Sequence, residues 1–261
     1  MGTSFGRGGA TTFQQDLQNS DCIVIEGSNM AECHPVGFQW VMEAKARGAK
    51  LIHVDPRFTR TSALADIHVP LRAGSDIAFL GGIVNYALQH DKYFRDYVVA
   101  YTNAPVILTE EFADTEDLDG VFSGLDRDGR SYDFHTWQYE GLEVQAAGGE
   151  RDKEYEDRVS GPQVRQAGRG EAHGSGGAGL PPGVPDRDPT LTHPRCVFQV
   201  LKRHYSRYTP EMVEQICGVP QDTFRQVCEL LTENSGRDRT SAFVYSVGWT
   251  QHTVGVQYIR T

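Results

Sequence analysis

The sequence predicts an α/β fold built on a doubly wound parallel sheet, and three observations support this. Short apolar runs rich in β-branched residues end at glycine or polar residues. These runs alternate with longer segments in which apolar residues recur at helical spacing. Residues that start and stop helices stand at the boundaries between the two kinds of segment. Strands that alternate with helices are typical of a parallel sheet covered by helices on both faces.

The first elements are marked by glycine and proline. The first predicted strand, residues 23–25, ends at Gly27. A helix then begins at Pro35, because the first helical turn tolerates a residue without an N–H, and it ends at Gly48. Residues 51–54 form the second strand.

The remaining elements follow the same logic. A helix begins at Asp76, after Gly74, and carries an apolar stripe to residue 88. A strand is predicted over residues 241–247 and runs into Gly248 and a polar cluster. Between them lie three predicted helices, with Thr209 and Gly218 as boundary residues: 196–208, 210–217 and 221–234.

The middle of the chain has a different composition. Residues 141–190 are crowded with glycine, proline and charge, and such a segment buries too little apolar surface to offset its chain entropy. We predict a disordered surface insertion there. Residues 1–140 are then the first part of an α/β dinucleotide-binding domain, and residues 191–261 are its second part, which is truncated. Both ends of the chain interrupt an element or loop, so we expect a fragment of a longer protein.

Composition narrows the classes of function. The net charge of −10 argues against a nucleic-acid partner, whose phosphates need a basic surface. No apolar run approaches the roughly 20 residues of a membrane span, so direct membrane insertion is not expected. The five cysteines never form a C-x-x-C pair, which favours buried free thiols over a local metal site. Cys33 is the exception, because it lies in a loop before a helix.

Polar residues gather where the predicted strands end, after residues 25, 54 and 247. Ligands of open α/β sheets bind beyond the carboxyl ends of the strands. The sequence therefore predicts a nucleotide-type binding edge.

Three segments carry a resemblance to a known family. They are GSNMAECHPVGFQWVMEAKARGAKLIHVDPRFTRTSALADIHVPLRAGSDIAFLGGIVNY, HPRCVFQVLKRHYSRYTPEMVEQICG and VGWTQHTVGVQYIRT. Together they resemble the catalytic subunit of formate dehydrogenases of the molybdopterin oxidoreductase family, and the respiratory type in particular. The similarity covers nearly all of the chain except the insertion.

The resemblance implies cofactors and partners. Subunits of this family bind molybdenum or tungsten through two molybdopterin guanine dinucleotides, and an N-terminal region carries a [4Fe–4S] cluster that this chain lacks. The chain would be most of one Rossmann-like domain that holds one dinucleotide. The intact enzyme would oxidise formate and pass electrons to iron–sulfur and membrane subunits. Twin-arginine export to the periplasm and a cytoplasmic location are both compatible with the sequence.

The resemblance also points to individual residues. Asn29, Glu32 and Cys33, with His34, stand where the family loop meets the dinucleotide. The positions that complete the cofactor-binding set are Asp55, Pro56, Arg57, Gly74, Asp76 and Gln251. In the family an acidic residue after a strand can bind ribose hydroxyls and an arginine can pair with phosphate.

Each assignment has a plainer alternative. Asn29 and Asp76 could be simple helix caps, Asp55 and Arg57 could form a surface ion pair, and Gln251 could be a buried structural amide. Arg60 and Arg72 could add positive charge for phosphates or could be solvated. His53 and His68 are expected to be structural, and the acidic stretch 110–119 is expected to be a solvated loop.

No residue of the chain matches a catalytic position or a metal ligand of the family. The selenocysteine or cysteine that ligates the metal lies upstream in the family, and the arginine that orients formate lies downstream. We therefore expect the chain alone to be inactive. Two other functions stay open: another molybdopterin oxidoreductase, such as a nitrate reductase, or a noncatalytic product of a split gene.

Overall fold

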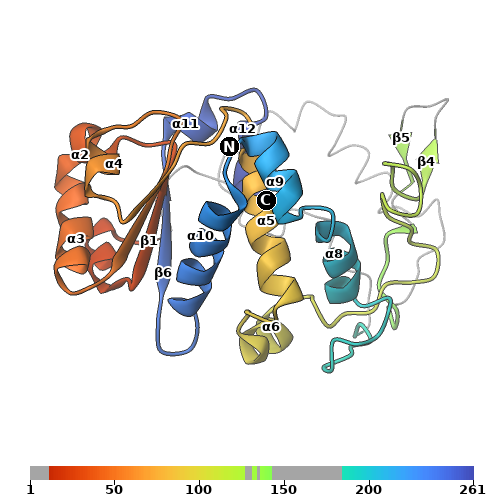
Figure 1. Cartoon of the computed structure of the whole chain (residues 1–261). Coiled ribbons are helices and arrows are strands. Elements are labelled where there is room, and N and C mark those ends of the chain that lie inside the picture. Colours follow the sequence, from red (N-terminus) through yellow and green to blue (C-terminus); the bar gives the residue numbers. More distant parts are fainter. Residues whose placement is uncertain (1–11, 127–130, 134–135, 143–183) are drawn as a thin grey trace, which may run out of the picture. The chain divides into compact units, whose positions relative to one another are not determined.

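The computed structural model describes residues 12–126, 131–133, 136–142 and 184–261 (Figure 1). They divide into two compact units, one formed by residues 10–94 with 205–261 and the other by residues 95–204. Most of the predicted insertion, residues 143–183, lies outside the described residues.

The larger unit is built on a four-stranded parallel sheet with the order β3-β2-β1-β6. Its strands are β1 (Cys22–Glu26), β2 (Lys50–Val54), β3 (Ile67–Val69) and β6 (Ser241–Tyr245). β1 lies in the centre, with β2 on one side and β6 on the other. The predicted α/β class with a parallel sheet is confirmed.

Alternation along β1 explains why helices cover both faces of the sheet (Figure 1). Ile23 and Ile25 pack on one face against η1 (Gln14–Asn19), α2 (Met30–Cys33) and α3 (Pro35–Ala46). Cys22 and Val24 point to the other face and pack against α5 (Asp76–Gln89), α9 (Pro210–Cys217) and α10 (Gln221–Glu233). Successive side chains of a strand point to opposite faces, so a continuous apolar run fills two cores.

The predicted helix boundaries are found in the structure. Pro35 is the first residue of α3, and Gly48 beyond its end has a φ of +101°. The Thr209 hydroxyl accepts a hydrogen bond from the N–H of Met212 at 3.3 Å and so caps α9. Gly218 ends that helix in the left-handed conformation, which glycine adopts without steric cost.

Several short elements were not predicted. They are α2, α4 (Arg60–Leu64), α6 (Arg95–Tyr101), β4 (Leu125–Asp126) and β5 (Ser131–Tyr132). The chain ends in α11 (Val247–Thr250) and α12 (Gly255–Arg260). No helix in the described part of the chain is long and apolar enough to span a membrane.

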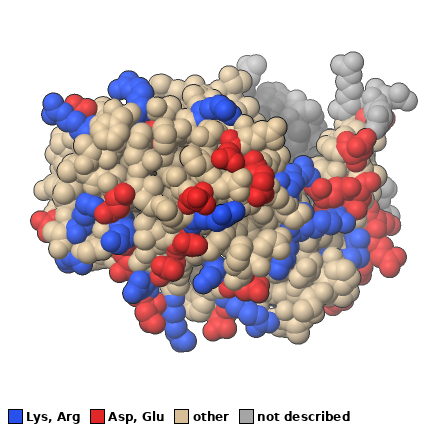
Figure 2. Space-filling view, in the orientation of Figure 1, with Lys and Arg blue, Asp and Glu red and all other residues tan. Residues whose placement is uncertain are grey.

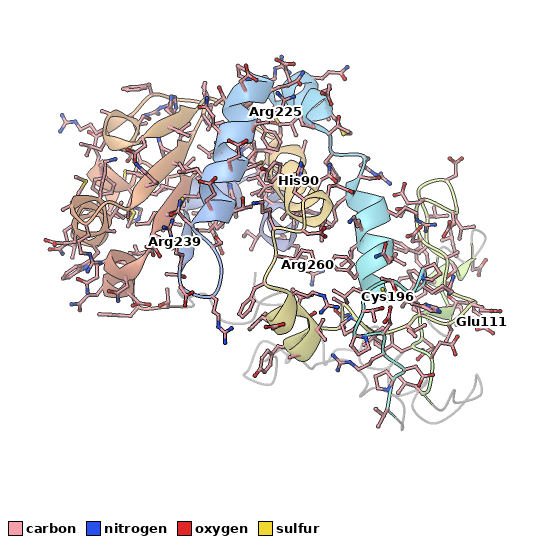
Figure 3. All side chains as sticks on the ribbon, turned by 60° about the horizontal axis from the view of Figure 1, so that its bottom comes forward. His90, Glu111, Cys196, Arg225, Arg239 and Arg260 are labelled. Carbon is pink, nitrogen blue, oxygen red and sulfur yellow. The ribbon has the colours of Figure 1, made fainter. Side chains whose placement is uncertain are left out.

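In the smaller unit, α8 (Val197–Tyr205) follows the segment that carries Cys196 (Figure 3). Arg203 on this helix pairs with Asp114 at 2.7 Å and with Asp117 at 2.9 Å. Asp114 is 4% exposed, so the prediction of a solvated acidic loop is wrong at this position. The guanidinium of Arg203 lowers the pKa of Asp117.

Candidate functional site

The parallel register brings three strand ends to the same edge of the sheet. Glu26, the last residue of β1, pairs with Val54 of β2 and Tyr245 of β6. The loops that follow these strands therefore start side by side, at what is called here the carboxyl edge. The chain moves from β1 outward through β2 to β3 and later returns to β6 on the other side. This reversal of direction makes the carboxyl ends of β1 and β6 a topological switch point.

Two glycines meet at that switch point. Gly27, with a φ of +60°, follows β1, and its carbonyl accepts a hydrogen bond from the N–H of Gly248 at 3.1 Å. A Cβ atom on Gly248 would overlap the backbone of Gly27. Only residues without a side chain allow two backbones to approach this closely.

The loop after β1 is joined to the loop after β2 by side chains. Asn29 donates from its amide to Glu32 at 2.5 Å and accepts from the Thr61 hydroxyl at 3.1 Å. Thr61 in turn accepts from the backbone N–H of Ala31 at 3.0 Å. Asn29 makes no side-chain cap to its own helix, so it serves as a link between two loops. Cys33 follows in an exposed position.

His53 contacts both loops at the same junction through its buried ring. Its Nε2 is 3.1 Å from the carbonyl oxygen of Ser28, and its Nδ1 is 2.8 Å from the Ser62 hydroxyl. Burial lowers the pKa of His53, which favours the neutral ring. In that form Nε2–H donates to Ser28, and Nδ1 accepts from Ser62. His53 therefore has the expected structural role, because its two hydrogen bonds join the loop after β1 to the segment after β2.

Asp55, Pro56 and Arg57 form a turn directly after β2. The Asp55 carboxylate accepts the N–H of Arg57 at 2.8 Å, while the Arg57 and Pro56 side chains are exposed. No ion pair among the described residues includes Asp55 or Arg57, so the surface ion pair considered from the sequence is not present there. The Arg57 guanidinium is available to an anion at this edge.

The entrance to α5 lies near the other end of the edge. Gly74 has a φ of +90°, Ser75 occupies the cap position, and Asp76 is the first residue of the helix with 6% exposure. Asp76 is therefore not the cap. Arg72 donates to the carbonyl oxygens of Gln215 and Ile216 at 2.6 and 2.9 Å, so it caps the carboxyl end of α9.

Glu26 is a residue of this edge that the sequence did not reveal. It closes an apolar strand, where an exposed charge would be unremarkable, yet it is 1% exposed. Burial first, and the neighbouring Asp76 carboxylate second, raise the pKa of Glu26 well above its ordinary value. Burial also raises the pKa of Asp76. A pair of carboxyl groups shielded from water is thus placed at the switch point.

Gln251 follows α11 at the same end of the unit and is exposed. The alternative of a buried structural amide is therefore not what the structure shows. Its neighbours Trp249 and Tyr258 are buried and pack against Leu80 of α5. The predicted positions thus form two groups, one beyond β1 and β2 and one around the start of α5.

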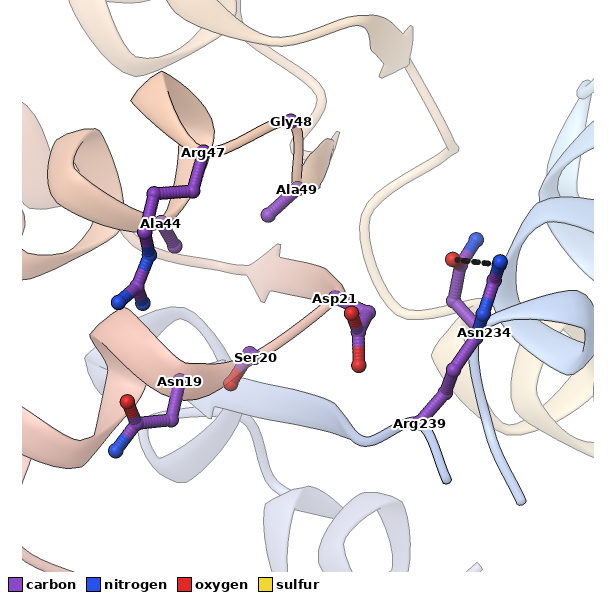
Figure 4. A pocket seen from close by; sticks show the side chains of 9 residues that line it. All are labelled: Asn19, Ser20, Asp21, Ala44, Arg47, Gly48, Ala49, Asn234 and Arg239. Carbon is purple, nitrogen blue, oxygen red and sulfur yellow. Dashed lines mark hydrogen bonds between the residues drawn. The ribbon is translucent and has the colours of Figure 1, made fainter. Parts of the chain in front are cut away.

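A pocket lies at the opposite edge of the sheet, where the strands begin. This amino edge has a polar pocket of about 370 Å³ (Figure 4), lined by Asn19, Ser20, Asp21, Ala44, Arg47, Gly48, Ala49, Asn234 and Arg239. Arg239 lies in the turn between α10 and β6 (Figure 3) and donates to Asn234 at 3.0 Å. None of the residues predicted to bind a cofactor lines this pocket.

Chemically, the carboxyl edge combines acceptors for ribose or base donors with an accessible guanidinium. No cluster of three or more metal-ligating side chains occurs among the described residues. On the face shown in Figure 2, Lys and Arg side chains are interspersed with Asp and Glu. The residues present suit an uncharged ring system joined to phosphate groups, because polar acceptors, close backbone and a cation share one edge.

Comparisons with known proteins give a family and a fold for the chain. The model of the molybdopterin oxidoreductase family matches residues 3–261. The formate dehydrogenase-O major subunit of Escherichia coli K12 is 44% identical over 262 residues, which is 100% of this chain and 22% of that subunit. The formate dehydrogenase subunit alpha of Megalodesulfovibrio gigas is 44% identical over 260 residues, with the same coverage.

A solved structure supports the fold. Acetylene hydratase from Pelobacter acetylenicus matches with a TM-score of 0.50 at 15% identity, over 95% of this chain and 22% of that one. At such low identity the likeness concerns the fold alone. The chain spans about a fifth of the length of the relatives it matches, since it covers 22% of each subunit named above.

Proposed function

The chain belongs to the molybdopterin oxidoreductase family, and we propose that its carboxyl edge binds the guanine dinucleotide part of a molybdopterin cofactor. Membership of the family, which confirms the resemblance described above, implies a molybdopterin cofactor with molybdenum or tungsten. The guanine dinucleotide form is part of the proposal. When bound, the metal supplies the redox chemistry, and the residues of this chain hold the organic part.

The observation that carries this proposal is the convergence of predicted residues on one edge. Two loops linked through Asn29 and Thr61 lie beyond β1 and β2, where the Arg57 guanidinium is exposed. Asp76 begins α5 close to the switch point. Phosphate pairs with arginine, and ribose hydroxyls donate to carboxylates such as Asp55.

Each remaining position receives a role in the proposal. Glu32 and Cys33 flank the loop that would face the dinucleotide, and Pro56 fixes the turn that presents its neighbours. Gly74 provides the positive φ with which the chain enters α5. Gln251, exposed after α11, would approach the pterin.

For the parent protein we propose oxidation of formate to carbon dioxide, with electrons passed to iron–sulfur centres. The support is the 44% identity to subunits named as formate dehydrogenases over the whole of this chain. This favours formate dehydrogenase over a nitrate reductase as the parent protein. Iron–sulfur and membrane subunits would be the partners, and the [4Fe–4S] cluster would lie outside this chain.

The test is cofactor content in the parent subunit. Asp55→Ala and Arg57→Ala should each lower the bound molybdopterin guanine dinucleotide, because an arginine–phosphate pair or a charged hydrogen bond contributes about 1.5–3 kcal/mol. Lys92→Ala, an exposed residue beyond α5, is the matched control. Wild-type dinucleotide and metal content in both edge variants, with circular dichroism unchanged, would refute the assignment.

We further propose that residues 1–140 and 191–261 belong to one dinucleotide-binding domain interrupted by residues 141–190. The support concerns residues 10–94 and 205–261, which form one compact unit because β6 pairs in parallel with β1 although the insertion separates them in sequence. Limited proteolysis should cut first within 141–190. Earlier cleavage between Ile23 and Leu80 would contradict this division.

A further inference from the structure

Glu26 has an unsatisfied carboxyl group in the middle of the proposed site. It is 1% exposed, and neither Oε1 nor Oε2 has a hydrogen-bond partner among the described residues. A buried polar group without a partner costs about 1–3 kcal/mol, and a charged one costs more. A side chain in this state at a strand end requires an explanation.

The groups that face Glu26 come from several elements. Asp76 of α5 lies close enough for the two carboxyl groups to influence each other's charge, and the indole of Trp249 on α11 is near both. The Trp249 Nε1 donor is itself buried and has no partner among the described residues. Three further titratable groups face the pair: Cys217 of α9, His252 after α11 and Tyr258 of α12.

One proton on the Glu26–Asp76 pair lets the two carboxyl groups form a hydrogen bond. Two ionised carboxylates only accept hydrogen bonds, so they cannot bond to each other, whereas a neutral carboxylic acid donates one. Asp76 is the first residue of a 14-residue helix, where free N–H groups favour a negative charge. Glu26 lies at a strand end and has no comparable support, so Glu26 is the partner that holds the proton. Its raised pKa agrees with this choice.

We propose that Glu26 is a positioning residue of the dinucleotide site, which as a neutral carboxylic acid donates a hydrogen bond to Asp76 and fixes that carboxylate for the ligand. The other oxygen of Glu26 accepts from Trp249 Nε1, so that the donor and the acceptors at this point are all satisfied. This inference rests on the proposed function, because Asp76 is taken to contact the dinucleotide. Glu26 itself is enclosed and touches no ligand.

The proposal has a pH signature. Once Glu26 loses its proton, two negative charges face each other at the edge, Asp76 loses its donor, and an anionic ligand is repelled. Affinity for a guanine nucleotide therefore falls on the alkaline side. In Glu26→Gln the amide donates to Asp76 at every pH, so this alkaline decline disappears. In Glu26→Ala no donor remains, and affinity is low throughout.

The experiment uses the 261-residue chain with GDP as the probe, since GDP carries the guanine, ribose and pyrophosphate. Calorimetry across a pH series should show about tenfold weaker binding in Glu26→Ala, the effect of one lost hydrogen bond to a charged group. Glu26→Gln should match the wild type at neutral pH and exceed it at alkaline pH. Glu43→Gln, on the exposed side of α3, is the control. Circular dichroism checks folding, and Glu26→Leu replaces Glu26→Ala if the latter unfolds.

Infrared spectroscopy gives a readout that needs no ligand. The wild type should show the carbonyl band of a protonated carboxylic acid at neutral pH, and Glu26→Gln should lack it. Absence of this band in the wild type overturns the protonated state. A shared alkaline decline in the wild type and Glu26→Gln overturns the positioning role. If the wild type does not bind GDP, the dinucleotide site and the positioning role both fall, while the infrared band still decides the proton.

Discussion

The two edges of the sheet are both polar, yet they are built in opposite ways. At the carboxyl edge α5 begins, two glycines bring backbones into contact, and carboxyl groups are enclosed. At the amino edge α3 and α10 end, and arginines stand beside their last turns. Helix amino ends attract anions, whereas carboxyl ends attract cations. The polar pocket lined by Arg47 and Arg239 lies at the amino edge, away from the residues predicted to bind the cofactor, so a pocket alone does not identify the anion site.

The largest expected difference between the two edges comes from adding one methyl group at each of them. Gly248→Ala places a Cβ against the Gly27 backbone, and we expect it to lower the free energy of unfolding by about 2–3 kcal/mol. Gly48→Ala at the amino edge has no atom within 4 Å to meet, so only its positive φ costs stability, about 1 kcal/mol. Urea denaturation measures both. Equal losses would show that the glycine contact is not tight.

A second test concerns acid sensitivity at the carboxyl edge. The pKa of His53 is lowered in the folded state from 6.5, so the unfolded chain binds protons more readily. Stability from this group is complete above about pH 6.5 and is lost as the pH falls below it. His53→Gln removes the titrating ring but retains an amide donor and acceptor, so it should reduce the loss of unfolding free energy between about pH 8 and pH 5. The exposed His90 provides the control, as His90→Gln, and an identical pH slope in wild type and His53→Gln would contradict this account.

Substitution of the arginines at the amino edge tests whether that edge takes part in cofactor binding. Arg239 donates to Asn234 at 3.0 Å just beyond α10, so Arg239→Ala should cost about 0.5–1 kcal/mol of stability. Arg47→Ala, at the exposed end of α3, should cost less. In the parent subunit neither change should alter the dinucleotide content. Loss of dinucleotide in Arg47→Ala or Arg239→Ala would move the cofactor site to the amino edge.

The smallest expected effect on stability comes from a cysteine, and two thiols are expected to differ in reactivity. Cys22 begins β1 at the amino edge, and burial raises its pKa to about 12, whereas Cys33 lies exposed at the carboxyl edge. A thiol reagent should label Cys33 before the other four cysteines, as seen by peptide mass mapping. Cys33→Ser should change stability by no more than about 0.5 kcal/mol. Labelling of Cys22 in the native chain would show that the sheet opens at its amino edge.

Much of the fold could be predicted because its signals are local. Pro35 and Gly48 bound α3, and Thr209 and Gly218 bound α9, through steric rules that act within one turn. Short elements such as α4 were missed because four or five residues do not show a helical period. The burial of four cysteines, predicted from spacing and composition, is confirmed.

The site was less accessible to sequence reasoning because its roles depend on distant partners. Arg72 was considered for phosphate binding, but it caps α9, whose position along the chain is more than a hundred residues away. Glu26 gave no signal, because its burial arises only when β1 is flanked by β2 and β6 and covered by α5. The roles of Asn29, Asp55, Asp76 and Gln251 toward the dinucleotide stay predictions.

The pairing of β1 with β6 has a consequence for how the chain folds. Asp21 and Thr240, which meet at the start of these strands, are 219 residues apart in sequence. β1, β2 and β3 with their helices can assemble from neighbouring segments, but β6 must close a long loop before its contacts contribute. During synthesis one side of β1 therefore stays unpaired until the 219 residues that separate Asp21 from Thr240 have been added. A chaperone that binds the open side of β1 would protect that strand until β6 arrives.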